Sequence, residues 1–315
     1  MQRKTLSILI CFAALAVSSN FTIAVCPSAD LTGDCFVDFS DFAVMAVDWP
    51  MADFNNFTVM ATQWLTEGVP DDPCNMAWVY IDDPGVPGHE GFNGYMSKYE
   101  TTNAQYCEYL NAALASGDIY VSDNMVYGSN GSNSGVDFEG ITYFDTFAGS
   151  PYSQITYNGR IFSVRSRDGY SMADHPVVQV SWFGATAFCN YYGYRLPTEW
   201  EWQAVADFDG NCIYACGATI DQSKVNYGDA NPLNLSGYPY TSPVDYYSSY
   251  GYGMNDMAGN VWEWTSSCCD AGCVYSFRAL RGGCWHFNDY NCMVSCLYSD
   301  PRHHKHSTMG FRVCR

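Results

Sequence analysis

The stretch that most constrains the fold of this chain is Gly253-Met-Asn-Asp-Met-Ala-Gly-Asn-Val-Trp-Glu-Trp264. It begins as a glycine-rich loop and ends in an alternating apolar run, which predicts a tight turn entering a buried strand. Asp256 and Glu263 are its only acids, and backbone carbonyls between them can point inward. Ca²⁺ takes about six to eight oxygens, usually from carboxylates and carbonyls, so the loop could enclose one ion. The alternative is a buried strand in which Glu263 is only hydrogen-bonded.

An acidic balance and a predicted export signal limit the class of protein. The formal net charge is −19 at pH 7, which argues against nucleic acid and anionic membrane surfaces as partners, because both attract Lys and Arg. Residues 1–25 have a basic start, an apolar run and a small-residue exit, which predicts a signal peptide. The apolar run, 6–17, is shorter than the ~20 residues that span a bilayer.

We therefore expect a secreted or extracytoplasmic protein. No second hydrophobic run follows the signal, so the mature chain is predicted to contain no transmembrane segment. Lipid anchoring at Cys26 is disfavoured because the bulky Val25 precedes it. The chain has 15 cysteines, and in an exported protein most of those past the signal are expected to form disulfides.

Residues 30–41 fit a calcium loop of the EF-hand type. Cys35 stands where such loops have Gly, and Asp41 where they have Glu, which resembles dockerin loops more than sensor EF-hands. Cys26 and Cys35 flank the start of the loop and are predicted to pair. The alternative is an acidic surface turn. The predicted calcium ligands are Asp30, Thr32, Asp34, Phe36 through its carbonyl, Asp38 and Asp41.

A repeat follows this loop, in which Phe39–Trp49 matches Phe54–Trp64. Each copy has apolar residues at i, i+3, i+4 and i+7, as in a short amphipathic helix. The second copy lacks a calcium loop, so residues 26–66 resemble a degenerate dockerin helix pair. Dockerins bind a cohesin partner, which makes a protein partner one interpretation and a small helical cap the other.

Residues 67–75, rich in Pro and Asp, are predicted to be a linker to a main domain over 76–315. Within it, Met76–Ile81 is predicted to be a strand, and 117–170 an insertion of short strands and loops with a hairpin at Tyr157–Arg160.

Three helices are expected in the main domain. The first runs from Asn103 to about Ala115, and the second covers Trp182–Tyr192. The third has Thr198 as its N-cap, with Glu201 completing a capping box. Few helices, many loops and late strands indicate an α+β fold.

Four blocks, in order, resemble the formylglycine-generating enzyme, or sulfatase-modifying factor, family. The resemblance covers residues 76–315 and implies the loop-rich, C-type-lectin-like α+β architecture of that family. The blocks are Lys98–Tyr106, then His175–Asn190 with Arg195–Trp202, then Gly253–Trp264, and finally Arg281–Trp285 with Gly310–Arg315.

The resemblance implies calcium and copper sites. Asp256 and Glu263 would bind Ca²⁺ by side chain, and Gly259 and Val261 by carbonyl. A second calcium site of the family would use Asn226 and the carbonyls of Tyr227 and Tyr238. Ser236 stands where that second site has a carboxylate, so this site is expected to be weak or absent.

The family's enzymes oxidise a substrate cysteine with O₂, using Cu(I) held by two cysteines, and soft thiolates suit that ion. The second of these positions is Cys292, but the first is Phe287, which cannot bind a metal. Cys284, at the position of an active-site serine, could form a displaced site with Cys292 and His286. Alternatively, Cys284 and Cys292 are structural cysteines in disulfides with Cys296, Cys314 or others.

The remaining cysteines and histidines suggest structural roles. Cys212 with Cys216, and the group Cys268, Cys269 and Cys273, could close small loops by disulfides. His303, His304 and His306 lie near Lys305 in a basic loop, which is interpreted as a solvated loop or as a metal site.

Three functions remain as hypotheses. The first is a secreted, calcium-stabilised, non-catalytic domain that binds a glycan or peptide, because Phe287 replaces a copper ligand. The second is a copper- and O₂-dependent oxidase that forms formylglycine in sulfatases through Cys284 and Cys292. The third is a subunit recruited to an extracellular assembly through residues 26–66.

Overall fold

The computed structural model describes residues 74–85, 90–129, 138–269 and 277–315. The predictions for residues 1–73 lie outside these ranges: the signal peptide, the dockerin-like repeat, its calcium loop from Asp30 to Asp41, and the Cys26–Cys35 pair. They remain predictions. The described residues all belong to one unit of the chain, 72–315.

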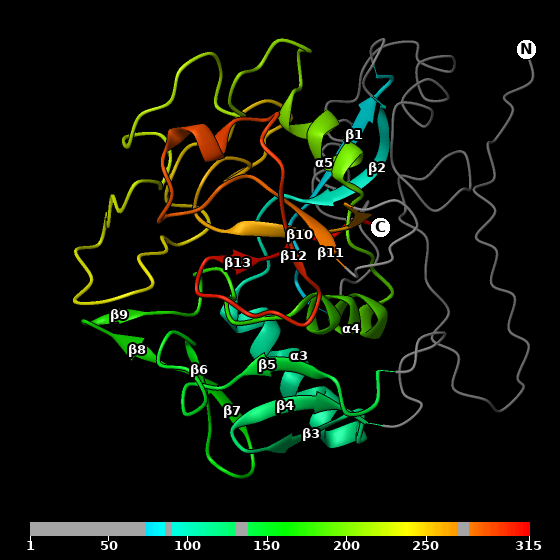
Figure 1. The fold of residues 1–315 in the computed structure, drawn as a ribbon, viewed down its shortest axis with the longest axis vertical. Helices are drawn as coiled ribbons and strands as arrows, with labels where there is room; N and C mark the ends of the chain where they lie inside the picture. The colour runs from blue at the N-terminus through cyan, green and yellow to red at the C-terminus, as the bar shows by residue number, and fades with distance from the viewer. Residues whose placement is uncertain (1–73, 86–89, 130–137, 270–276) are drawn as a thin grey trace, which may run out of the picture. The chain divides into compact units, whose positions relative to one another are not determined.

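A four-stranded sheet with the order β12-β11-β10-β13 lies at the centre of this unit (Figure 1). Strand β10 (Trp262–Cys268) continues the glycine-rich stretch, as the alternating apolar pattern predicted. It pairs antiparallel with β11 (Phe277–Arg281), and β11 pairs antiparallel with β12 (Tyr298–Pro301). Strand β13 (Met309–Gly310) lies parallel to β10 on its other side. The sheet therefore brings the last residues of the chain against the glycine-rich stretch.

The three predicted helices are all present. Helix α3 (Asn103–Ser116) begins one residue after Thr102, which caps it in a capping box. Helix α4 (Trp182–Tyr192) has the predicted bounds and is capped by Ser181. Helix α5 (Glu199–Ala206) is capped by Thr198 in the expected capping box with Glu201. Each cap satisfies a backbone N–H that the helix itself cannot bond.

Short antiparallel strands make up most of the remaining regular structure. The first strand is shifted by two residues from its predicted start, and the hairpin at Tyr157–Arg160 is confirmed between β6 and β7. These strands are β1 (Trp78–Asp83), β2 (Phe92–Ser97), β3 (Ile119–Ser122), β4 (Met125–Gly128), β5 (Thr142–Asp145), β6 (Ile155–Tyr157), β7 (Phe162–Val164), β8 (Ser166–Arg167) and β9 (Tyr170–Ser171).

Figure 1 shows α3 and α4 on one side of the central sheet, and α5 with the β1–β2 hairpin on the other. Aromatic rings fill the space beneath the sheet. The ring centroids of Tyr106 and Phe188 lie 5.9 Å apart, and those of Phe188 and Phe311 5.4 Å apart. Such pairs add to the area that their burial removes from water. Much of the high aromatic content is therefore structural.

One residue of the predicted linker packs into the main domain. Cys74, which was assigned to the linker, is fully buried in the main core together with Met76. At the opposite end, Tyr95 and Arg315 exchange backbone hydrogen bonds. Among the helices of the described residues, none has the length and apolar character needed to cross a membrane.

The expected disulfides are mostly absent from the described residues. Cys268 is disulfide-bonded, which agrees with a staple in its group. Cys212 and Cys216 are not linked, contrary to the predicted small loop. Cys284, Cys292, Cys296 and Cys314 are also unlinked. Cys284 belongs to the main core, and Cys292 and Cys314 belong to a second core around Trp202.

Candidate functional site

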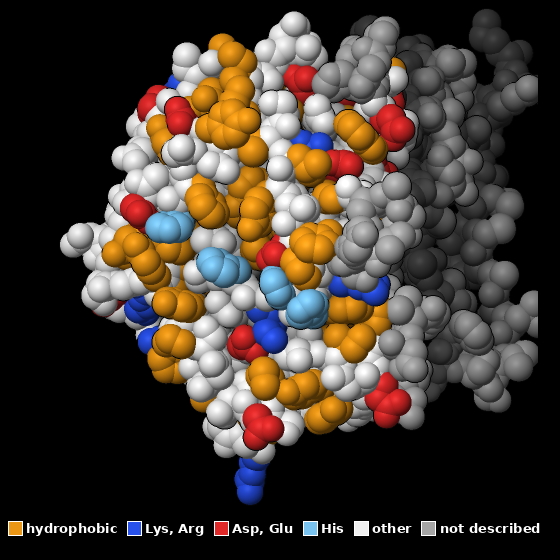
Figure 2. Space-filling model, viewed as in Figure 1, with side chains coloured by type: hydrophobic (Ala, Val, Ile, Leu, Met, Phe, Trp, Pro, Cys, Tyr) orange, Lys and Arg blue, Asp and Glu red, His pale blue; other side chains and the backbone are white. Residues whose placement is uncertain are grey.

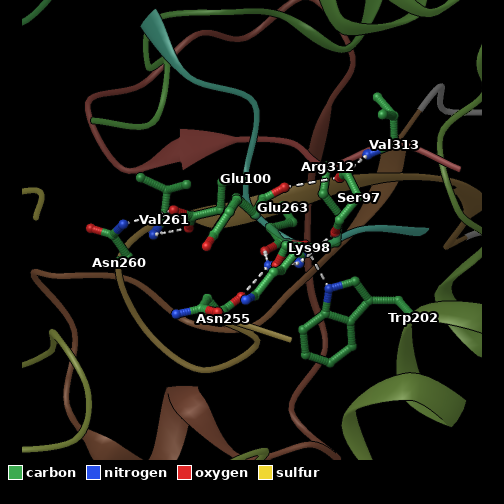
Figure 3. Close-up of polar contacts among 11 residues, drawn as sticks. Ser97, Lys98, Glu100, Trp202, Asn255, Asn260, Val261, Glu263, Arg312 and Val313 are labelled. Carbon is green, nitrogen blue, oxygen red and sulfur yellow. Dashed lines mark hydrogen bonds and ion pairs between the residues drawn. The ribbon is translucent and has the colours of Figure 1, made fainter. Parts of the chain in front are cut away.

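A buried ion pair connects the glycine-rich stretch to the end of the chain. Glu263 lies on β10 and Arg312 follows β13, and both side chains are fully inaccessible. Arg312 Nε donates to Glu263 Oε2 at 2.6 Å, and Arg312 Nη2 donates to Oε1 at 2.7 Å (Figure 3). Trp202 Nε1 also donates to Oε2, at 2.7 Å. This bidentate geometry is the strongest form of such a pair.

Every N–H of the Arg312 guanidinium has an acceptor. Beyond Glu263, it donates to the carbonyls of Ser97 at 3.1 Å, Lys98 at 3.2 Å and Asn255 at 2.9 Å. A guanidinium offers five N–H donors and cannot lose its charge in a protein, so its burial requires a complete set of acceptors. Arg312 therefore joins β2, the glycine-rich loop and β10 at one point.

Glu100, from the first family block, is a second buried carboxylate at this place. It accepts from the backbone N–H of Val261 at 3.0 Å and from Asn260 Nδ2 at 2.7 Å (Figure 3). Burial raises its pKa well above the usual range, and the charges of Asp256 and Glu263 raise it further. The side chain thus shapes the turn that precedes β10.

Asp256 is the third carboxylate of this group. Its backbone has a φ of 56°, and its side chain is 8% exposed. Its Oδ2 is buried without a hydrogen-bond partner, as is Oδ1 of the neighbouring Asn255. Burial raises the pKa of Asp256, and the charges of Glu263 and Asp245 add to the rise while Arg312 opposes it. A buried, unpaired carboxylate oxygen is costly unless a cation or a proton satisfies it.

These three carboxylates and Arg312 form what we call the carboxylate cluster. Three acids stand against one guanidinium, so full ionisation leaves an excess of negative charge. The unpartnered Asp256 oxygen and this excess fit a bound Ca²⁺, with Asp256 as the side-chain ligand. The predicted carbonyl ligands, Gly259 and Val261, lie in the same loop. Calcium binding by Glu263, in contrast, would compete with the ion pair that the structure already contains.

The residues proposed for the second calcium site are less suited to a cation. Asn226 is fully buried; its Nδ2 donates to the carbonyl of Tyr240 at 2.8 Å, while its Oδ1 has no hydrogen-bond partner among the described residues and remains available to a cation. The carbonyl of Tyr227 already accepts from Ala230 N and Gln222 Nε2. Tyr238 lies on the surface, with its ring 4.9 Å from that of Trp285.

Phe287 occupies an exposed position beside the buried Trp262. Its side chain is 38% exposed, and its ring centroid lies 6.5 Å from that of Trp262. Tyr298 stacks on the same indole at 5.4 Å. Trp262 Nε1 is buried without a partner. Because Trp262 is only 1% exposed, this donor does not reach the surface, and the accessible part of the place is formed by the rings of Phe287 and Tyr298.

Both thiols of the predicted copper site are buried. Cys284 is inaccessible, and burial raises its pKa to about 12 against the opposing effect of the His286 and Phe287 backbone N–H groups. Cys292 ends the short 3-10 helix η2 (Asp289–Cys292) and is 1% exposed. Its pKa is also raised, first by burial and then by the nearby Cys284. Both are therefore neutral thiols near pH 7, whereas Cu(I) binds thiolates.

The histidines do not complete a metal site with these thiols. His286 Nδ1 lies 2.9 Å from Asp229 Oδ1, at the surface. Figure 2 shows histidine side chains gathered on one face. His303, His304 and His306 are all exposed. Within the described ranges, the one group of three side chains with atoms close enough to share a metal is Asp207, Asp209 and Cys212.

Sequence analysis assigned no role to Glu100 or Arg312. Both lie inside blocks that resemble the family, Glu100 in Lys98–Tyr106 and Arg312 in Gly310–Arg315. A charged residue within such a block was the only sequence pattern that pointed to either side chain. Arg312 is 49 residues from Glu263, and neither residue's local pattern reveals the other.

Comparison with known proteins agrees with the four blocks. A model of the Sulfatase-modifying factor enzyme 1-like domain matches residues 90–315. The mouse formylglycine-generating enzyme (Mus musculus) is 28% identical over 226 residues, covering 64% of this chain and 58% of that protein. A cattle (Bos taurus) protein named inactive C-alpha-formylglycine-generating enzyme 2 is 37% identical over 118 residues, 35% of this chain and 38% of its own.

The fold is likewise shared with a solved structure. CarF superposes with a TM-score of 0.50 at 20% identity, over 77% of this chain and 98% of CarF. The chain spans 14% to 58% of the length of the first curated relatives that it matches. Because the family model covers most of the chain, from residue 90, just before β2, to residue 315, this chain belongs to the sulfatase-modifying factor enzyme 1-like family.

Proposed function

We propose that this domain is a non-catalytic, calcium-stabilised binding protein of its family. The observation that carries the proposal is Phe287, an aromatic ring at the position of a copper thiolate. The remaining sulfurs cannot easily replace that ligand, because Cys284 and Cys292 are buried thiols with raised pKa values. The cattle relative that is named inactive shows that the family contains members without activity.

A direct assay tests the loss of catalysis. The mature chain is incubated with Cu(I), O₂ and a peptide containing Cys-x-Pro-x-Arg, and mass spectrometry follows conversion of the cysteine to an aldehyde. We expect no conversion by the wild type. The Cys292→Ser variant is the control, because it removes the one retained copper position. Conversion by the wild type that is lost in Cys292→Ser would refute the proposal.

The surface around Phe287 is the best candidate for ligand binding. Its partly exposed side chains include Tyr238 at 43%, Tyr290 at 67%, Leu297 at 48% and Tyr298 at 41%. Aromatic side chains offer flat apolar area with polar edges, which suits stacking against a sugar or a peptide side chain. We infer an extracellular glycan or peptide as ligand. Binding to glycan and peptide libraries should fall in Tyr298→Ala if this surface is used.

The oxidase remains the second candidate because one observation favours it. Cys284 and Cys292 are both unlinked, so no disulfide consumes the sulfurs that a displaced copper site needs. An active enzyme would require a rearrangement that exposes both thiols and lowers their pKa values. The aldehyde assay distinguishes the two functions, with Cys284→Ser added as a second variant.

The site of action follows from the N-terminal sequence. We propose that residues 1–25 direct secretion and that residues 26–66 bind Ca²⁺ and recruit a protein partner. The support is the signal pattern and the loop from Asp30 to Asp41. Loss of partner capture from culture medium when 26–66 are deleted, with an unchanged melting temperature of the main domain, is the expected result.

A further inference from the structure

The β8–β9 hairpin is fastened to the loop of residues 231–241, where the family resemblance places a second calcium ion. Asp168 Oδ2 accepts from the backbone N–H of Ser236 at 3.0 Å, and Oδ1 accepts from its hydroxyl at 2.8 Å. These bonds lower the pKa of Asp168, with a smaller contribution from Arg167. Position 236 has a serine where the family resemblance implies a carboxylate. A carboxylate is present beside it nevertheless, from Asp168, which lies 68 positions earlier in the chain.

Arg167 makes the second attachment. Its Nη1 donates to the carbonyl of Pro239 at 3.0 Å, and its Nε lies 3.6 Å from Asp168 Oδ2. The side chain is only 10% exposed, and its Nη2 is buried without a partner. A permanent positive charge therefore lies against the loop, bonded to one of its carbonyl oxygens.

The hairpin turn places these two side chains together. Asp168 and Gly169 are the two central residues of the turn, with φ values of 52° and 88°. Two-residue hairpin turns with positive φ at both positions favour Asp-Gly, because few other residues adopt that backbone conformation without strain. Asp168 consequently follows Arg167 directly and projects from the tip of the hairpin region toward Ser236, with which it bonds.

Calcium does not fit this place as the structure has it. Ser236 offers a hydroxyl instead of a carboxylate, the carbonyl of Tyr227 already accepts two hydrogen bonds, and the guanidinium of Arg167 would repel a divalent cation. Asn226 Oδ1 is buried without a partner and is available to a cation, but the rest of the ligand set that the resemblance implies is incomplete and is opposed by the charge of Arg167.

We propose that Arg167 and Asp168 replace the second calcium ion of the family as the fastener of the 231–241 loop. The Arg167 guanidinium bonds to a loop carbonyl in place of the ion, and the Asp168 carboxylate bonds to Ser236 in place of the ion. This inference is independent of whether the domain is catalytic. It predicts that the loop is ordered in the absence of Ca²⁺, unlike the loop that contains Asp256.

Hydrogen–deuterium exchange of the full chain, read by mass spectrometry, tests this directly. Exchange of peptides covering 231–241 should be the same in Ca²⁺ and in chelator, whereas peptides covering 253–261 should exchange faster in chelator. In the Arg167→Ala/Asp168→Ala variant, exchange of 231–241 should rise about tenfold, because three hydrogen bonds to the loop are lost. Arg165→Ala is the matched control, because Arg165 stacks on Phe147 with its guanidinium 3.7 Å from the ring centroid.

Two results would overturn the proposal. One is faster exchange of 231–241 in the wild type when Ca²⁺ is removed, which is measurable even if a variant fails to fold. The other is unchanged exchange in Arg167→Ala/Asp168→Ala. A reverse variant, Arg167→Ala with Ser236→Asp, should make protection of the 231–241 loop depend on Ca²⁺. If its exchange stays fast in Ca²⁺, the proposal that Arg167 and Asp168 replace the calcium ion is contradicted. If only 253–261 fails to respond to chelator, the calcium proposal for Asp256 fails and this one stands.

Discussion

The carboxylate cluster and the segment from Cys284 to Cys292 are neighbours in the fold, yet they differ in how completely their functional groups are paired. In the cluster, Arg312 has an acceptor for every donor, and Glu263 is paired through both oxygens. In the segment, an exposed aromatic ring, Phe287, stands where the family resemblance implies a copper thiolate, and the sulfurs of Cys284 and Cys292 are buried. Asn260 joins the two regions, since its carbonyl accepts from Trp285 N and its side chain donates to Glu100.

Under the proposed non-catalytic function, the difference would mean that fold and activity have separated within one domain. The cluster is required for folding, because a buried charge that loses its partner is strongly destabilising. In the segment, Cys284 and Cys292 are core residues, but Phe287 is 38% exposed, so a substitution at that position costs the core little. Function belongs to sites carried by a fold and can be lost while the fold remains.

The largest expected effect is on the cluster. Arg312→Met should lower the free energy of unfolding by about 3–5 kcal/mol, because Glu263 stays buried without its counter-charge. Urea unfolding in Ca²⁺ measures the change. The control is Arg195→Ala, which removes an exposed pair with Glu201 at 2.7 Å and should cost about 0.2–1 kcal/mol. Equal losses in the two variants would show that the cluster does not hold the fold.

Calcium should produce the next largest effect. At a Ca²⁺ concentration about 100 times the Kd, binding to the folded state alone stabilises by about 2.7 kcal/mol. Differential scanning calorimetry of the wild type should therefore show a higher melting temperature in Ca²⁺ than in chelator. In the Asp256→Asn variant, the contribution of the main domain to this shift should disappear. A shift that survives in full would exclude Asp256 as a ligand.

In chelator, stability should depend on pH with a sign set by the raised pKa values of Glu100 and Asp256. A carboxyl whose pKa is raised by folding contributes stability below its unfolded value, about 4, and loses it as pH rises through the folded value. The melting temperature of the calcium-free protein should thus fall as pH rises above about 4 from this source. Thermal unfolding of the calcium-free protein at a series of pH values above about 4 measures this fall.

One buried histidine acts with the opposite sign. Burial lowers the pKa of His175 to about 4, and the charge of Arg167 lowers it further against the Thr241 bond. Its contribution is present above the unfolded value of about 6.5 and is lost as pH falls toward the folded value. Subtracting the pH profile of stability of Asp256→Asn from that of the wild type leaves the contribution of Asp256, because the contribution of His175 is common to both proteins. A difference profile that is flat would contradict the assignment to Asp256.

The smallest effect on stability is expected in the segment. Phe287→Cys should change the free energy of unfolding by less than about 1 kcal/mol, because the side chain is 38% exposed. The new thiol should react with a water-soluble thiol reagent in the native state, and Phe287→Ser provides the matched background. A loss as large as that of Arg312→Met would mean that the ring has a structural role comparable to the ion pair.

The sequence predicted the local structure of the domain well, because that structure depends on neighbouring residues. The capping box of Thr198 and Glu201 and the bounds of Trp182–Tyr192 follow from patterns within a few positions. The identity of the family followed from blocks whose order alone is informative. Glu263 was placed on a buried strand, as one of the two interpretations stated.

Pairings across the chain could not be predicted in this way. Arg312 meets Glu263 across 49 positions, and Arg167 meets Pro239 across 72. Nothing in the local periodicity of either residue specifies its partner, because the sheet order and the turn at Asp168-Gly169 decide it. The disulfide expectation failed for a related reason: a cysteine count gives no information on which side chains meet in three dimensions.

The most direct test of the account is a Cu(I) titration of reduced protein against a competing chromophoric ligand, with the wild type and Phe287→Cys compared. The account predicts that the wild type does not form a tight complex of one Cu(I) per chain, and that Phe287→Cys gains affinity by restoring a second thiolate beside Cys292. A tight, stoichiometric Cu(I) complex of the wild type that consumes O₂ and oxidises thiols would contradict it.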